Sequence, residues 1–559
     1  MQISNSMRSP IVLLGVLLGA CSEAPPPAPA AQVPMGEPAF VGSGECRDCH
    51  EVAFAQWLGS HHDLAMQVAS DATVLGDFDD VSFEYFGTDT RFLRSGDDYV
   101  VRTQDADGEV RDFVIGYTFG VEPLQQYLVE MANGHVQPLP FAWDTRDASD
   151  GGQRWFHLYP DEYIGPGDAL FWTGREQNWN YMCAECHSTN VQLNYDLASD
   201  RFETTWSEIN VGCEACHGPA SNHVSAARAG TLPPDSALLV DLADRDGVAW
   251  RMNLDTGIAE RQPMAMRAPG QPEACGRCHA RRGVIAADYE YGQPLADTHR
   301  VALLTEPLYY PDGQIRDEVF VYGSFLQSRM YQAGVTCSDC HNPHSLELHT
   351  GPDPDLVCAQ CHLPARFAAS EHHGHEAGQV ACVDCHMPAT NYMVVDPRRD
   401  HSLRVPRPDL SLATGAPNAC TMCHEDRDAA WAAEAARDWW GEPGMRAPVD
   451  SGIRRATQIA TLAMPLAQDV IPAVERALRD PDPLVRMAAA RVAPGLPPDS
   501  QLQQLAPLLE DDILSVRLEA VQALAPARDY LPATVLGALE RAADEYLSLI
   551  HISEPTRLC

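Results

Sequence analysis

The sequence contains no lysine. Its 39 basic side chains are all arginine and stand against 78 acidic ones, so the 559-residue chain has a formal net charge of −39. A chain this acidic is unsuited to wrapping the phosphate backbone of a nucleic acid, which excludes that class of function. Either GC-rich codon usage or an acidic, salt-adapted surface accounts for the missing lysine, and both concern solubility rather than fold.

Cysteine is almost absent outside one repeated pattern, Cys-x-x-Cys-His, which holds 16 of the 18 cysteines. The eight pairs are Cys46 and Cys49, Cys183 and Cys186, Cys213 and Cys216, Cys275 and Cys278, Cys337 and Cys340, Cys358 and Cys361, Cys382 and Cys385, and Cys420 and Cys423. Two thiols at this spacing can form thioethers with the two vinyl groups of one haem, and the adjacent imidazole can ligate its iron. Zinc ribbons do not need a histidine after every second cysteine, and disulfide frameworks suit small secreted domains. The pattern therefore predicts eight covalently bound c-type haems.

The N-terminus has an apolar run from Ile11 to Ala20, preceded by Arg8. Ten residues are too few to span a bilayer, so we interpret 1–20 as a signal peptide. The run ends Leu-Gly-Ala-Cys21, which resembles the lipobox of bacterial lipoproteins, although an ordinary secretory signal ending near a cysteine is the alternative. We expect a lipid on Cys21, a proline-rich linker at 21–40, and export to the periplasm or outer membrane.

Motif spacing and periodicity suggest the organisation of the rest. The haem motifs occupy 41–426, which we predict to be a mainly α and coil cytochrome domain because so little chain surrounds each porphyrin. Alternating runs such as DYVVRTQ and EVRDFVIGYTF, separated by the turn DADG, predict a β-rich insertion at about 81–165. At 427–546 a 31-residue repeat, seen at Arg486 and Arg517, resembles HEAT repeats and predicts an α-helical solenoid, with ordinary helical packing as the alternative. The tail at 547–559 resembles a translated sequencing adapter and is set aside with His551 and Cys559.

Each haem iron needs axial ligands. The motifs supply the proximal histidines His50, His187, His217, His279, His341, His362, His386 and His424. Twelve other histidines remain for the eight distal positions, and we choose His61, His62, His223, His299, His344, His349, His373 and His401. The EHHGH segment offers His372, His373 or His375 as a distal ligand. Shortly after the first motif, His61 or His62 could take the same role. We interpret His135 and His157 as strand residues.

The segments CRDCHEVAFAQWLGSHH, GCEACHGPASNH, GVTCSDCHNPH and CVDCHMP resemble bacterial multihaem c-type cytochromes of the cytochrome c-554/c-552-like and doubled-CxxCH type. Some members carry C-terminal helical repeats, often followed by tetratricopeptide repeats. Octahaem relatives include nitrite, hydroxylamine and tetrathionate oxidoreductases, and the nitrite reductases typically carry one CxxCK motif. Here every motif ends in histidine and lysine is absent, so that catalytic site is missing.

Two functions follow from this resemblance. In the first, which we favour, the protein carries electrons along its haems in a respiratory or extracellular route and docks redox partner proteins through the solenoid. In the second, it is an octahaem oxidoreductase in which one open haem acts on a small nitrogen or sulfur species. The two differ in whether every iron has a second histidine opposite the first.

Overall fold

The structure is a computed structural model that describes residues 36–243, 245–263, 270–286, 289–376, 378–441 and 449–553, with side chains up to 545. The predicted signal peptide, the predicted lipidation of Cys21 and most of the proline-rich linker lie outside these residues. So does the end of the predicted adapter tail. Within the described part of the chain, no helix is both long enough and apolar enough to cross a membrane.

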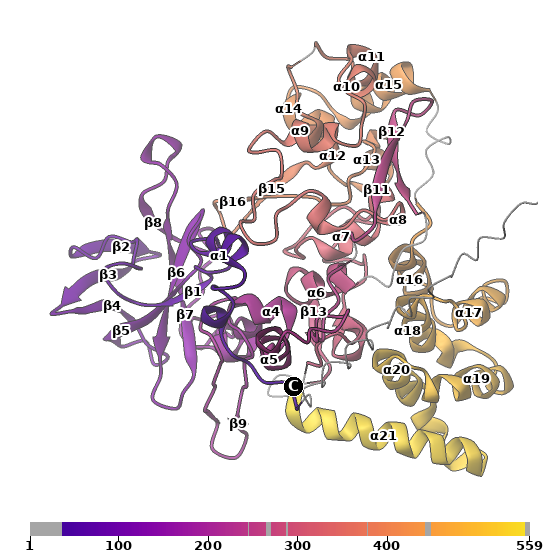
Figure 1. Cartoon of the computed structure of the whole chain (residues 1–559), viewed down its shortest axis with the longest axis horizontal. Helices are drawn as coiled ribbons and strands as arrows, with labels where there is room; N and C mark the ends of the chain where they lie inside the picture. Colours follow the sequence, from indigo (N-terminus) through magenta and orange to yellow (C-terminus); the bar gives the residue numbers. More distant parts are fainter. Residues whose placement is uncertain are drawn as a thin grey trace, which may run out of the picture.

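An antiparallel sheet forms one end of the molecule (Figure 1). Its strands follow the order β2-β3-β4-β5-β6-β7-β8, and β1 pairs with β5. The bounds are β1 Met66–Val68, β2 Val81–Tyr85, β3 Thr88–Ser95, β4 Asp98–Gln104, β5 Val110–Phe119, β6 Leu124–Glu130, β7 Val136–Asp144 and β8 Arg154–His157. This sheet confirms the predicted β-rich insertion. It also means that the region around the motifs mixes strand with helix, so the predicted mainly helical fold is not confirmed.

Hydrophobic alternation explains the sheet and its register. Phe92 on β3 lies opposite Val101 on β4, and both side chains are fully buried. The ring of Phe92 stacks on Trp155 of β8 with centroids 3.6 Å apart. The predicted DADG turn joins β4 to β5, and its Gly108 backbone N–H donates to the carbonyl of Asp105. Gly108 has φ +84°, a conformation that glycine adopts at little cost.

Short helices and small hairpins follow the sheet and wrap the motifs. The helices are α1 Glu51–Trp57, α2 Trp179–Met182, α3 Ala184–His187, α4 Cys213–His217, α5 Ser221–Ala229, α6 Gly270–His279, α7 Tyr322–Leu326, α8 Arg329–Gln332, α9 Pro354–Ala359, α10 Pro364–Phe367, α11 Ser370–His373, α12 Cys382–His386, α13 Pro408–Thr414, α14 Ala419–Cys423 and α15 Ala429–Trp440. The hairpin strands are β9 Tyr195–Asp196 with β10 Arg201–Phe202, β11 Ala249–Asn253 with β12 Ile258–Gln262, β13 Arg282–Val284 with β14 His299–Val301, and β15 Ala389–Tyr392 with β16 Asp396–Arg399.

The C-terminal helices lie on the other side of the motif region from the sheet (Figure 1). They are α16 Gly452–Ala460, α17 Ile471–Ala477, α18 Pro483–Val492, α19 Pro498–Leu505, α20 Leu514–Leu524 and α21 Ala533–Ser553. One arginine per repeat reaches the acidic residue 25 or 28 positions later: Arg455 binds Asp480, Arg486 binds Asp511, and Arg517 binds Glu545. This ladder gives the predicted 31-residue period a structural role, while the solenoid arrangement stays a prediction.

The C-terminal helices are joined to the motif region by a shared core. One hydrophobic cluster combines Leu303 and Tyr309 with Ile453, Val485 and other helix residues. The carboxylate of Glu519 on α20, which is 3% exposed, binds Arg300 of β14 at 2.8 Å and Arg491 of α18 at 2.8 Å. The backbone N–H of Leu514 donates to Asp297 at 2.6 Å. The repeats are therefore an integral part of the described structure.

Candidate functional site

Each Cys-x-x-Cys-His motif forms a helical turn. In five motifs the histidine backbone N–H donates to the carbonyl of the first cysteine, as in His50 to Cys46 at 2.9 Å and His424 to Cys420 at 2.9 Å. In the third, fourth and seventh motifs the pentapeptide lies inside or forms helices α4, α6 and α12. A helical turn places residues i, i+3 and i+4 on one side of the chain. Both thiols and the imidazole of a motif can therefore contact the same planar group.

Five of these motif histidines have a second imidazole at a characteristic separation. The ring centres are 6.0 Å apart for His50 and His223, 6.3 Å for His279 and His62, 6.4 Å for His341 and His401, 6.1 Å for His386 and His372, and 6.1 Å for His424 and His375. Direct ring stacking is much closer in this molecule, since the rings of Tyr85 and His157 are 3.6 Å apart. Each histidine pair thus leaves a gap between its rings.

The gap fits an iron atom. Metal–imidazole bonds are about 2.0 Å long and an imidazole nitrogen lies about 1.1 Å from its ring centre, so two imidazoles on opposite sides of one metal have centres about 6.2 Å apart. The observed separations agree with this value. The chemistry of the donor set also fits, because two thiols stand beside each pair. These residues can therefore hold a c-type haem, which would supply a one-electron iron centre when bound.

Backbone carbonyls orient several of these imidazoles. Nδ1 of His386 donates to Arg404 at 2.8 Å, Nδ1 of His401 to Arg399 at 3.0 Å, and Nδ1 of His223 to Ser236 at 2.8 Å. A carbonyl oxygen only accepts, so the proton is on Nδ1 and the Nε2 lone pair remains for a metal.

Burial keeps the imidazoles in the ligating, neutral form. It lowers the pKa of His62 to about 4 and that of His217 to about 4, with further lowering by neighbouring histidines. Among these neighbours, His344 contributes most to lowering the pKa of His217, so His344 lies near the third motif. Burial disfavours the charged imidazolium, and the neutral imidazole is the metal ligand.

The other predicted distal residues have different contacts. His299 is almost fully buried, with Nε2 3.0 Å from Glu185 and Nδ1 2.9 Å from Thr298. Nε2 of His349 lies 2.9 Å from the Ser338 carbonyl. His61 is exposed and lies 3.8 Å from Glu122. His373 accepts a hydrogen bond from the backbone of His375, and its neighbours His372 and His375 form the two pairs described above.

Three motif histidines, His187, His217 and His362, lie outside these five pairs, and two of them have a phenylalanine ring as neighbour. The ring of Phe119 lies edge-on to His187 at 5.0 Å, and Nδ1 of His187 lies 3.1 Å from the Ala65 carbonyl. His362 has Phe367 edge-on at 5.3 Å. Among the residues that the structure describes, neither has a second imidazole at the separation of the five pairs.

Thiols of different motifs meet in space, and they define an order. In four pairs, a thiol of one motif lies close enough to raise the pKa of a thiol of another: Cys213 acts on Cys46, Cys278 on Cys186, Cys337 on Cys275, and Cys358 on Cys382. Weaker electrostatic effects on the thiol pKa link Cys216 with Cys278, Cys340 with Cys358, and Cys385 with Cys420. The spatial series therefore runs through motifs one, three, four, five, six, seven and eight, with motif two attached beside motif four.

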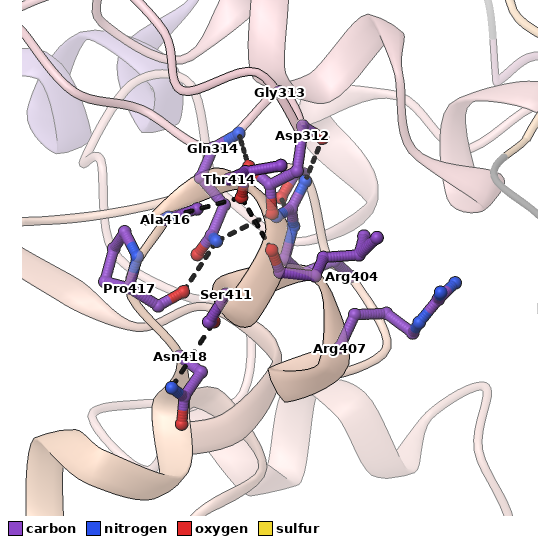
Figure 2. A network of polar contacts seen from close by, with 12 residues as sticks. Asp312, Gly313, Gln314, Arg404, Arg407, Ser411, Thr414, Ala416, Pro417 and Asn418 are labelled. Carbon is purple, nitrogen blue, oxygen red and sulfur yellow. Dashed lines mark hydrogen bonds and ion pairs between the residues drawn. The ribbon is translucent and has the colours of Figure 1, made fainter. Parts of the chain in front are cut away.

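Buried polar contacts hold the motifs in this order. The carboxylate of Glu214, which is 1% exposed, accepts from the backbone of Gly42 at 2.7 Å and of Ala220 at 2.8 Å, which ties the first motif to the third. Figure 2 shows a second network, in which Arg404 binds Asp312 at 2.8 Å and Gln314 donates to the Pro417 carbonyl at 2.7 Å. Because the Arg404 carbonyl holds His386 and Pro417 precedes α14, this network positions the seventh and eighth motifs together.

Positive charge is buried where motifs two and four meet. Arg277 and Arg282 both bind the carboxylate of Glu185, at 3.3 Å and 2.9 Å, and both are nearly buried. Burial alone would raise the pKa of Glu185, but its contacts with His299 and the two arginines hold it well below the usual range. Two guanidinium groups facing one carboxylate leave a net positive charge that suits an anionic haem propionate.

Comparison with known proteins supports the cytochrome assignment. The family model described as cytochrome c554 and c-prime matches residues 171–218, which hold the second and third motifs, and a HEAT repeat model matches residues 470–492. A curated cytochrome c-554 from Chloroflexus aurantiacus is 23% identical over 236 residues, covering 36% of this chain and 52% of that protein. The match thus spans about half the length of that relative. These findings confirm the predicted resemblance to multihaem c-type cytochromes and the C-terminal HEAT repeat, and they imply covalently bound c-type haem.

Two solved structures are also similar. The outer cell wall cytochrome OcwA has a TM-score of 0.46 at 16% identity, with 91% of this chain and 99% of that chain covered. The octahaem sulfite reductase MccA of Wolinella succinogenes has a TM-score of 0.32 at 12% identity, with 93% and 84% covered.

Proposed function

We propose that this chain is an electron conduit in which eight c-type haems are held in the spatial order of the motifs. The five imidazole pairs at 6.0 to 6.4 Å carry this proposal, because two strong axial nitrogen ligands suit an iron that exchanges electrons without binding substrate. The sixteen motif cysteines and eight motif histidines would hold the haems, and His62, His223, His372, His375 and His401 would be distal ligands, with His344 serving the third motif.

The proposed series has two accessible ends. Fourteen of the sixteen motif thiols are half-buried, whereas Cys49 of the first motif and Cys423 of the eighth are exposed. These are the motifs at the two ends of the spatial series. Electrons would enter at one end and leave at the other.

Haem counting and spectroscopy test the conduit. Intact mass of the exported protein and its pyridine haemochrome spectrum should give eight haems per chain, and electron paramagnetic resonance of the oxidised protein should be dominated by low-spin iron. Fewer haems, or mainly high-spin iron, would contradict the proposal. The matched variants Cys46→Ser and Cys49→Ser should each weaken attachment at one site only.

A second function deserves testing because of the second motif. His187 faces Phe119 rather than an imidazole, and it lies beside the series rather than within it. An iron ligated there on one side could bind a small nitrogen or sulfur species, as an oxidoreductase would. One high-spin haem that shifts to low spin on adding cyanide or nitrite, and that disappears in His187→Ala, would support this function. The conduit requires no such shift.

The cellular setting remains part of the proposal. Haem attachment of this kind suits an exported protein, and the N-terminal pattern is consistent with a lipid anchor on Cys21 in the periplasm or at the outer membrane. Labelling with a radioactive or alkyne fatty acid, compared between the native chain and Cys21→Ala, tests the anchor.

A further inference from the structure

An exposed tryptophan contacts the last imidazole pair of the series. Trp439 on α15 has its ring 6.3 Å from that of His375, and 47% of the residue is exposed. Its ring also lies against Gly374, where an added Cβ would come within 2.7 Å of it, so the backbone between the distal histidines is shaped to receive the indole. Trp439 thus connects the His424–His375 site to solvent.

Apolar side chains are exposed near the eighth motif on two neighbouring helices. Met422, between the two motif cysteines, is 43% exposed, and its neighbour Cys423 is exposed as well. Helix α14, which carries both residues, packs beside α15, which carries Trp439. An apolar centre with a polar rim is the usual composition of a protein interface.

The rim of this surface is acidic. Between 425 and 438 the chain has five acidic residues and two arginines, and all seven are exposed. Arg427 lies over the ring of Trp431 and pairs with Asp426, so its charge is already engaged. Glu425 and Glu434 are both exposed to solvent. Such a field attracts a partner of opposite charge.

We propose that this surface, defined by Met422, Trp439, Glu425, Asp426 and Glu434, docks a soluble redox protein with a positively charged face around its own cofactor. The inference rests on the proposed function, because it makes the eighth motif one end of the conduit. A haem iron held by His424 and His375 would supply the electron, going from ferrous to ferric while the partner is reduced by one electron.

The first motif is the natural comparison. It is also exposed and acidic, but its tryptophan, Trp57, is buried and donates to the Val211 carbonyl at 2.9 Å. Among the residues that the structure describes, no aromatic side chain near the first motif is exposed to the extent that Trp439 is. Removing two charges there is therefore a matched control for removing two charges at the eighth motif.

The experiment compares two double variants of the haem-loaded full chain. Glu425→Gln with Glu434→Gln neutralises the eighth-motif rim, and Asp48→Asn with Glu51→Gln removes the same charge at the first motif. The probe is a basic mitochondrial-type cytochrome c. Titration calorimetry with its redox-inert zinc form gives the affinity, and stopped-flow reduction of its ferric form gives the second-order rate constant as a function of ionic strength.

We expect the eighth-motif variant to lower both the affinity and the low-salt rate constant by about three- to tenfold, and to flatten the salt dependence, because electrostatic steering is lost. Trp439→Leu should lower affinity too, and the first-motif variant should stay within about twofold of the native protein. Equal effects at both ends, a larger effect at the first motif, or no effect would overturn the docking proposal. A haem count below eight would instead contradict the proposed function.

Discussion

Replacing Glu519 with alanine tests how firmly the C-terminal repeats are joined to the motif region. Glu519 is 3% exposed and binds Arg300 and Arg491, each at 2.8 Å. Removing one partner of a buried ion pair costs about 3 to 5 kcal/mol, because the other charge stays buried. Arg300 keeps 20% exposure and Arg491 keeps 44%, so we expect a loss near the lower figure, about 3 kcal/mol.

The assay is thermal unfolding of the haem-loaded protein, followed by circular dichroism at the helix band and by the haem Soret band. If the repeats and the motif region unfold as one unit of roughly 500 residues, an unfolding entropy of about 2.1 cal/mol/K per residue converts a loss of about 3 kcal/mol into a Tm lower by about 3 °C. Both signals should shift together, because α20 carries Glu519 and β14 carries Arg300.

The control is a pair with the same chemistry at the surface. Glu510 binds Arg541 at 2.8 Å, but both side chains are 69% exposed, so Glu510→Ala should change stability by no more than about 1 kcal/mol. A Tm shift in Glu519→Ala that is no larger than in Glu510→Ala would refute the reasoning. A shift in the helix signal alone would show that the repeats unfold independently.

Three further predictions concern the metal sites and the sheet. His401→Ala removes the imidazole 6.4 Å from His341, so the oxidised protein should gain a high-spin signal of one iron, whereas His349→Ala should not; identical spectra would contradict the ligand assignment. His62→Ala should likewise create one high-spin iron and His61→Ala none, because His61 is exposed and its partner is Glu122. Burial alone would raise the pKa of Asp144, but hydrogen bonds from Arg146 outweigh burial and hold this pKa below its usual value. The ionised Asp144 therefore stabilises the sheet at pH values above the unfolded pKa of about 3.9. This stabilisation is lost as the pH falls through the lower, folded pKa. The stability difference between native protein and Asp144→Asn, followed by tryptophan fluorescence, should therefore be largest near pH 7 and shrink below about pH 4, and a constant difference would count against it.

Local features of the site could be read from the sequence, and long-range ones could not. The spacing of Cys46, Cys49 and His50 predicts a helical turn because the i, i+3 and i+4 positions depend only on neighbouring residues. The spatial order depends on contacts such as that between Cys46 and Cys213, which are 167 residues apart and are brought together by Glu214. No periodicity along the chain encodes such a contact.

The distal ligands illustrate the same limit. The EHHGH segment contains three histidines, and sequence alone does not separate them. In the structure Gly374 adopts a left-handed conformation with φ +72°, and this turn directs His372 and His375 towards different motifs. The β-rich insertion was predictable because the alternation of apolar and polar residues along a strand is local. The pairing of β1 with β5 was not, because β2, β3 and β4 lie between these two strands in the sequence. The repeat period was readable from Arg486 and Arg517, but the bridge from Glu519 to Arg300 was not.

The thiol contacts between motifs have a consequence for biosynthesis. Cys46 lies against Cys213, and Cys358 lies against Cys382, so a chain that folded before receiving its haems would hold unprotected thiols of different motifs side by side. An oxidising compartment would then join them as disulfides and block four attachment sites at once. Under the proposed haem attachment, we therefore expect the chain to be kept reduced and to receive its haems before folding brings these thiols together.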